Sequence, residues 1–260
     1  MKKQLCRFFF VFISYSLLPT LYFSSCTSTS HIIRYEEKFI AVDSTLKSDS
    51  AITAEIAPYK EQFSKIMDEV LAVSDQVLMK SNPEGLLGDF TADITLTKAQ
   101  EFCSEQKDSC AAEICVLNNG GLRNPLPKGT ITLGNIFQLM PFENEIVILK
   151  LKGEAVKEFL DFVANKGGMP IAGMRMKIKN SMANEVTIGG KPFDISKSYS
   201  IVTSDYLADG GDNMTFFAKP IKKIITGKKM RDAIIEYLKD ESKKGNIISI
   251  KKDGRIQPVE

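Results

Sequence analysis

Two glycine pairs constrain the fold of this chain most strongly, because each calls for a sharp turn. The first lies in Asn118-Asn119-Gly120-Gly121-Leu122-Arg123, directly after the apolar run 114–117. The second lies in Tyr206-Leu207-Ala208-Asp209-Gly210-Gly211-Asp212, soon after a predicted strand at 199–203. Glycine has no Cβ and tolerates positive φ, so the backbone can turn tightly and approach a ligand closely. An apolar run that ends in such a loop is typical of a buried strand.

The rest of the chain mixes helical and strand patterns without regular alternation. Apolar residues from Ile52 to Val70 recur at spacings of four and three, which predicts a helix with a kink or late start at Pro58. Other helices are expected at 86–102, 132–140 with Thr132 as its cap, 155–165 and 230–238, and strands at 73–79, 114–117, 146–152, 174–178, 186–188, 199–203 and 247–251. An entry strand is expected within 31–46. We therefore predict one α+β domain over residues 31–260.

The N-terminal segment predicts export. Lys2, Lys3 and Arg7 precede an apolar run at 8–18, whose 11 residues are too few to span a bilayer comfortably. We interpret residues 1–25 as a signal peptide of the lipoprotein type, because Phe23-Ser24-Ser25-Cys26 resembles the bacterial lipoprotein signal. Its first position is usually Leu, so Phe23 is a departure.

On this interpretation Cys26 is the lipidation site and residues 26–30 form a polar tether. The protein would be exported and held on a bacterial membrane by its acyl chains, facing the periplasm or the cell surface. The alternative is an uncleaved or conventionally cleaved signal with an incidental cysteine. Three cysteines remain in the folded part, namely Cys103, Cys110 and Cys115; at most one disulfide can form among them, and their spacing matches no common zinc pattern.

The charge balance excludes nucleic acid as an expected partner. The formal net charge is +2, from 34 basic and 32 acidic residues. Lysine pairs do cluster toward the C-terminus, at 222–223, 228–229, 243–244 and 251–252, but acidic and apolar residues interleave them. We interpret them as a solvated helix face.

Histidine chemistry is also not expected. His31 is the only histidine and lies just beyond the expected tether. Ser-His, Cys-His and His-based metal sites therefore have no base or ligand available. No acidic cluster has the spacing of a calcium loop or of a two-carboxylate hydrolase. We expect no catalytic residue, metal or cofactor in this chain, and interpret it as a binder whose ligand is processed elsewhere.

The side chains around the glycine pairs suit a flat, polar ligand. Asn118 offers both a donor and an acceptor, Arg123 a planar donor fork, and Asp212 an acceptor for sugar hydroxyls. Phe142 and Tyr206 could enclose a purine or pyrimidine ring if they flank one pocket. Each feature alone has a plainer interpretation, since a Gly-Gly turn with a surface arginine is usually a loop and such aromatics usually pack in a core.

The ordered set of motifs resembles the C-terminal domain of the 5′-nucleotidase family. It comprises the two glycine segments, Pro127 to Thr132, Met140-Pro141-Phe142, Leu151-Lys152-Gly153, Ala172-Gly173-Met174 and Tyr199, and the likeness runs from about residue 35 to Asp253-Gly254-Arg255-Ile256. The first motif usually reads Asn-Gly-Gly-Gly-Ile-Arg, so Asn119 replaces a glycine. The resemblance implies an α/β/β/α layered domain that supplies the substrate pocket.

The resemblance also implies a role for each matched residue. Phe142 and Tyr206 would sandwich the base, Asn118 would contact the nucleoside, Arg123 would lie on the ribose or carboxylate-facing side, Asp212 would accept ribose hydroxyls, and Gly173 would line the base pocket. The family places an arginine shortly before the position of Glu84, where this chain has Asn82-Pro83. That contact is missing from the sequence.

Family enzymes also carry an N-terminal metallophosphoesterase domain with two metals, which the resemblance does not extend to. Nothing here matches its Asp-x-His or Gly-Asn-His-Glu motifs. Hydrolysis by this chain alone is therefore not expected. The leading hypothesis is a recognition subunit that binds a nucleoside monophosphate or nucleoside and works with a separately encoded metallophosphatase, which holds the divalent metals. The alternatives are a non-catalytic nucleoside-binding surface lipoprotein, and a lipoprotein that kept the fold but lost the pocket.

Overall fold

The computed structural model describes residues 34, 36–43, 45–106 and 110–259. The chain divides into two units, Met1–Ser50 and Ala51–Glu260. The predicted signal peptide, Cys26, the tether and His31 lie outside the described residues. The entry strand expected within 31–46 is absent from the described part of that range. Phe39, Ile40 and Val42 are exposed there, and without a neighbouring strand their backbone groups have no ladder to join.

Five of the described α-helices match predicted ones, and the short helix α6 is an addition. The helices are α2 (Ser50–Met67), α3 (Leu86–Glu105), α4 (Leu133–Leu139), α5 (Gly153–Asn165), α6 (Asp205–Ala208) and α7 (Met230–Lys243). The Thr132 hydroxyl caps α4 by accepting from the backbone N–H of Asn135, as its position predicts. Pro58 does not delay or end α2, which begins eight residues before it. No helix among the described residues is long and apolar enough to cross a membrane.

Three sheets complete the domain and confirm its α+β class. The central sheet has the order β10 (Lys222–Lys229), β4 (Glu145–Lys152), β9 (Ser198–Ser204), β2 (Ile114–Val116) and β5 (Ile171–Ala172). A four-stranded sheet has the order β11 (Ile256–Pro258), β6 (Met174–Lys179), β7 (Met182–Ile188) and β8 (Lys191–Pro192), and β1 (Val70–Ser74) pairs with β3 (Gly129–Thr132). The four strand pairs within the central sheet are antiparallel except β2 with β9, which is parallel.

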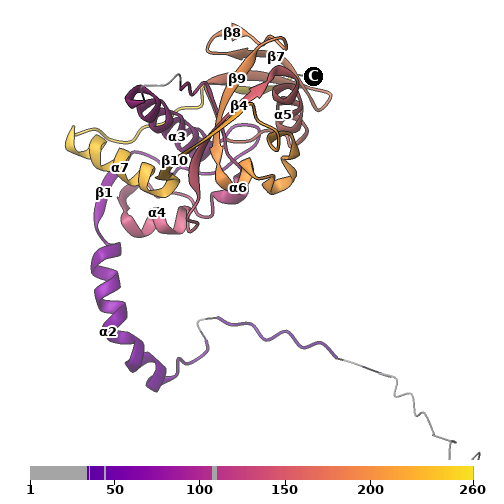
Figure 1. Ribbon diagram of the computed structural model, residues 1–260. Helices are drawn as coiled ribbons and strands as arrows, with labels where there is room; N and C mark the ends of the chain where they lie inside the picture. The colour runs from indigo at the N-terminus through magenta and orange to yellow at the C-terminus, as the bar shows by residue number, and fades with distance from the viewer. Residues whose placement is uncertain (1–33, 35, 44, 107–109, 260) are drawn as a thin grey trace, which may run out of the picture. The chain divides into compact units, whose positions relative to one another are not determined.

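The central sheet is buried on both faces. In β4, Ile146 and Ile148 join a core cluster that includes residues of α3 and α7, whereas Val147 and Leu149 join a second cluster that includes residues of α5. Successive residues of a strand point to opposite faces, so this alternation gives each face its own core. In Figure 1, α3 is dark purple and α7 is gold, and the two helices pack together although they are distant in sequence.

Two C-terminal predictions are wrong. Lys222, Lys223, Lys228 and Lys229 lie on β10 rather than on a helix face. In the described sheet β10 is an edge strand with β4 as its neighbour. Lysines on an edge strand oppose its pairing with a strand of another chain. Residues 247–251 form no strand of their own, since only Ile248 makes an isolated bridge, to Ser74.

One disulfide joins Cys103 at the end of α3 to Cys110. Cys115 on β2 is left as a free, buried thiol. Burial raises the pKa of Cys115 well above its ordinary value, because the thiolate would lose its hydration. This thiol is therefore inert and packs as a small apolar side chain.

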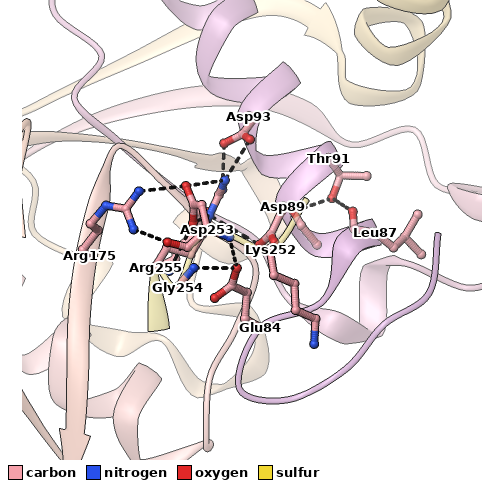
Figure 2. Close-up of polar contacts among 12 residues, drawn as sticks. Glu84, Leu87, Asp89, Thr91, Asp93, Arg175, Lys252, Asp253, Gly254 and Arg255 are labelled. Carbon is pink, nitrogen blue, oxygen red and sulfur yellow. Dashed lines mark hydrogen bonds and ion pairs between the residues drawn. The ribbon is translucent and has the colours of Figure 1, made fainter. Parts of the chain in front are cut away.

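A partly buried ionic cluster attaches the C-terminal segment to α3 (Figure 2). Arg255 donates from Nη1 to Asp93 Oδ1 at 2.7 Å and from Nε to Asp253 Oδ1 at 3.1 Å. Glu84 Oε1 accepts from the backbone N–H of Asp253 at 2.8 Å. Asp89 is 2% exposed, and its Oδ2 has no hydrogen-bond partner among the described residues. Burial raises the pKa of Asp89 to about 7, although the Arg255 charge opposes the shift.

We predict that the free energy of unfolding of Asp89→Asn rises relative to that of the wild type as pH increases from 5 to 8. The folded state holds the Asp89 proton up to a pKa of about 7, whereas the unfolded chain releases it near a pKa of about 3.9. The contribution of this carboxyl to stability is therefore lost as pH rises through this window, and asparagine has no such loss. Denaturant unfolding at both pH values measures the difference.

Asp75→Asn, at an exposed aspartate, is the control and should keep the wild-type pH dependence. A free-energy difference between Asp89→Asn and wild type that stays constant across this range would contradict the prediction.

Candidate functional site

The pairing of β2 with β9 brings the two glycine segments together. These strands are adjacent and parallel, with Ile114 opposite Ile201 and Cys115 opposite Val202. The loops that follow adjacent parallel strands emerge at the same edge of the sheet, where ligands commonly bind in open sheets. Asn118 follows β2, and Asp212 follows β9 after the short helix α6. This one strand pair thus brings together two residues that are 94 positions apart in the sequence.

A hydrogen-bonded triad lies where the loops meet. Asn118 Nδ2 donates to Asp212 Oδ2 at 2.6 Å, and the Tyr206 hydroxyl donates to Asp212 Oδ1 at 2.8 Å. The backbone N–H of Asp212 in turn donates to the Tyr206 hydroxyl at 3.3 Å. Both carboxylate oxygens of Asp212 are therefore oriented by other residues, and each retains further acceptor capacity for a ligand hydroxyl.

The triad forms one side of an open cavity of about 340 Å³. A pocket of this size is at the lower end of the range for small-molecule sites. Its lining consists of Asn118, Gly120, Gly121, Arg123, Phe142, Asn144, Tyr206 and Asp212. Five of the six residues predicted for the site, all but Gly173, thus line the same cavity.

Phe142 and Tyr206 give the cavity its apolar surface. Their side chains are 48% and 49% exposed, unlike the core phenylalanines, which are almost fully buried. Phe142 comes from the loop between α4 and β4, and Tyr206 from α6. Half-exposed aromatic faces from two separate elements are available for ring stacking, which a buried pair would not be.

Arg123 is held by a hydrogen bond within the first glycine segment. Arg123 Nη1 donates to the Gly120 carbonyl at 3.3 Å, so the guanidinium lies against its own turn and lines the cavity. Its remaining N–H groups can donate to hydroxyl, phosphate or carboxylate oxygens. A Cβ on Gly121 would lie 2.8 Å from Asn118 Oδ1, so glycine is needed there to leave room for the triad.

Gly173 does not reach this cavity. It follows β5, which runs antiparallel to β2 with Ala172 opposite Cys115, so the chain after β5 emerges at the other end of β2. Its φ is +76°, and a Cβ would lie 2.0 Å from the Glu113 carbonyl oxygen. It lines instead a second, polar cavity of about 360 Å³, beside Asp93, Arg175, Asp253 and Arg255.

Sequence reasoning missed two contributors. Asn144 lines the cavity, and its only signal was its place two residues after Phe142. Lys80 Nζ donates to the Asn119 carbonyl at 3.2 Å, and Asn119 Nδ2 donates to Asn82 Oδ1 at 3.3 Å. The segment where the family arginine is absent thus contacts the first glycine segment, and Lys80 brings a positive charge to it.

An apolar recess adjoins the cavity and shares part of its lining. Leu117, Leu122, Met140 and Met230 surround it, and at about 20 Å³ it has room for about one water molecule. No group of three or more His, Cys, Asp or Glu side chains among the described residues could hold a metal ion. The lining of the cavity offers hydrogen-bonding and stacking groups for a ligand.

We predict that Gly211→Ala displaces Tyr206 from the triad. A Cβ at residue 211 would lie 2.5 Å from the Tyr206 ring, so the ring must move and the bond from its hydroxyl to Asp212 should be lost. The ring NMR signals of Tyr206 and the side-chain amide signals of Asn118 report this directly. Gly227→Ala is the control for backbone strain without a clash, because its φ is +72° and a Cβ there meets nothing within 4 Å. Unchanged Tyr206 and Asn118 signals in Gly211→Ala would refute the steric argument.

Comparison with known proteins identifies a family for most of the second unit. Residues 68–219, more than half of the chain, match the model of the family described as 5′-nucleotidase, C-terminal domain. The trifunctional nucleotide phosphoesterase YfkN of Bacillus subtilis is 27% identical over 85% of this chain and 16% of its own length. The 5′-nucleotidase of Vibrio vulnificus is 22% identical (78% of this chain, 36% of its own), and the cell wall protein Lmo0130 of Listeria monocytogenes 25% (78% and 29%).

Solved structures share the fold. The 5′-nucleotidase precursor of Thermus thermophilus superposes with a TM-score of 0.67 at 23% identity, covering 81% of this chain and 44% of that one. The NAD nucleotidase of Haemophilus influenzae gives a TM-score of 0.59 at 18% identity, covering 82% and 42%. The chain spans less than half the length of each of these relatives. It belongs to the 5′-nucleotidase C-terminal domain family.

Proposed function

We propose that this chain is the nucleotide-recognition subunit of a split 5′-nucleotidase, acting with a separately encoded metallophosphatase in nucleotide catabolism. The observation that carries the proposal is the oriented Asp212 carboxylate in a cavity that also has two half-exposed aromatic rings. Such a site matches the two halves of a nucleoside, a flat base and a sugar with hydroxyl donors. The family supports a nucleotide as the ligand class.

In this proposal five of the lining side chains have a chemical task. Phe142 and Tyr206 stack on the base, which is worth about 1–3 kcal/mol per base. Asp212 accepts from ribose hydroxyls, and Asn118 both holds Asp212 and presents its own carbonyl oxygen to the nucleoside. Arg123 donates on the ribose or carboxylate-facing side. Binding by these groups orients the ligand so that its phosphate faces the partner, whose two metals would supply the activated water.

Gly173 has no task in this site, because it lies at the other end of β2. Lys80 takes a place in the proposal instead, at the turn beside Arg123. Its ammonium compensates in charge, though not in its hydrogen-bond geometry, for the arginine that the family pattern has nearby.

We further propose that the protein is exported and lipid-anchored through Cys26. The disulfide between Cys103 and Cys110 supports an oxidising compartment, since such bonds seldom persist in reducing cytoplasm. A relative described as a cell wall protein supports the same location. Mass spectrometry of the purified protein tests the anchor, with a diacylated or triacylated N-terminal Cys26 as the expected result.

We predict that the protein binds adenosine and AMP, and that Phe142→Ala and Tyr206→Ala each weaken binding by about 5- to 150-fold, the range that loss of one stacked ring implies. Titration calorimetry measures the affinities. Ile225→Ala, at an exposed apolar residue of β10, is the control and should bind as the wild type does. Absence of measurable binding by any nucleoside or nucleotide would leave a protein that kept the fold and lost the pocket.

We also predict that adding this chain accelerates phosphate release from AMP by a secreted metallophosphatase carrying Asp-x-His and Gly-Asn-His-Glu motifs, preferably one encoded next to it. Tyr206→Ala should remove the acceleration while leaving the phosphatase alone unaffected. If the chain binds AMP but does not change the rate, the split-enzyme proposal fails and the non-catalytic nucleoside-binding alternative replaces it.

A further inference from the structure

Helix α2 has a narrow apolar stripe that the domain does not bury. Ile52, Ile56, Tyr59, Phe63 and Ile66 follow one another at intervals of four, three, four and three residues. Their side chains are between 51% and 73% exposed, and none of the helix residues is buried. Large apolar side chains scattered singly on a surface need no explanation, but a continuous row of them marks an interaction surface.

The spacing of the stripe favours another helix as its occupant. A helix that packs on a globular core usually carries three or four apolar positions per two turns. The stripe of α2 carries two positions in every seven, which is the a and d pattern of a helix-to-helix seam. With Ile56 and Phe63 at a positions, Ile52, Tyr59 and Ile66 occupy d positions.

The residues that flank the stripe give the partner helix an orientation. In this register Glu55 is a g position and Lys60 is the following e position. Two parallel, in-register copies of α2 bring Glu55 of each copy beside Lys60 of the other, so opposite charges meet across the seam on both sides. An antiparallel pair does not bring these two charges together. The helix is thus complementary to a parallel copy of itself.

The opposite face of α2 is suited to solvent. Pro58 falls at a c position, away from the seam, so its ring does not obstruct a partner helix. Lys65 Nζ and Glu61 Oε1 form an exposed ion pair at 3.1 Å, at c and f positions on the same outer face. The ring of Pro58 and the charged groups of this ion pair therefore lie outside the stripe.

A membrane surface fits α2 less well than a second helix does. Helices that lie in a lipid interface are rich in Lys and Arg on their polar face. The helix has two glutamates and two lysines, Glu55, Lys60, Glu61 and Lys65, and no basic face. Most of the stability of a helix in a protein comes from packing of its apolar face, and none of the 18 residues of α2 is buried, so a partner helix would stabilise it.

We propose that α2 is a homodimerisation helix, which pairs in parallel with α2 of a second copy through the stripe from Ile52 to Ile66. The seam is about two and a half heptads long, so the dimer is weak and forms as the local concentration rises. The pairing needs no nucleotide and no phosphatase. It is therefore independent of the function proposed above.

The test is sedimentation equilibrium of the full chain in a mild detergent, which keeps the apolar N-terminal run from associating. We expect a monomer-dimer equilibrium, and Phe63→Asp should raise the dimer dissociation constant about tenfold or more, because it puts a charge into the seam. The matched control is Ser64→Asp, which adds the same carboxylate on the outer face and should dimerise as the wild type does. Circular dichroism checks that the domain stays folded in both variants.

A charge exchange tests the parallel register. Glu55→Lys should weaken the dimer, since two lysines then meet across the seam, and Glu55→Lys combined with Lys60→Glu should restore it. A chain that stays monomeric overturns the proposal, as does a dimer indifferent to Phe63→Asp or a double variant that fails to recover. A monomer that instead binds the phosphatase through the stripe also overturns it, by assigning the stripe another occupant.

Discussion

The parallel pairing of β2 with β9 is the contact on which the candidate site depends. Both strands lie inside the central sheet, and Ile114 and Cys115 on β2 supply apolar side chains to the two different core clusters. Moving either strand by one residue would exchange its side chains between two cores that are packed with different residues, so the packing on both sides fixes the register. That register determines the distance in space between Asn118 and Asp212. Core packing thus positions a polar site at the surface.

The ionic cluster around Arg255 has a complementary role at the other end of the sheet. Burial alone lowers the pKa of this guanidinium, but its hydrogen bonds to Asp93 and Asp253 raise the pKa above the ordinary value, so it stays charged. The cluster anchors the last strand, β11, whose only neighbour is β6. The second cavity lies beside it and has charged groups that already pair with one another. The two ends of β2 therefore have different roles. The end near Arg255 is structural, whereas the end near Asn118 has donors and acceptors left for a ligand.

Recognition and hydrolysis are separable because they need different residues. Stacking and hydroxyl recognition need aromatic rings and an oriented carboxylate, which a single domain can hold. Metal-assisted phosphate cleavage needs clustered His, Asp and Asn ligands, and the described residues have no such cluster. This chain covers less than half the length of each of the two solved relatives, so the shared fold is one part of a longer chain in both.

The sequence by itself determined the α+β class, the helices with strong periodicity or a clear cap, and five of the residues that line the cavity. These follow from local pattern and from ordered motifs. The tertiary structure decided which strands are neighbours, since one buried apolar run resembles another and only packing selects its partner. For that reason the sequence misjudged β10, whose lysines look like a solvated helix until β4 pairs with it, and Gly173, which the antiparallel β5 carries to the far end of β2. Local pattern specifies elements, whereas non-local strand pairing specifies where their ends meet.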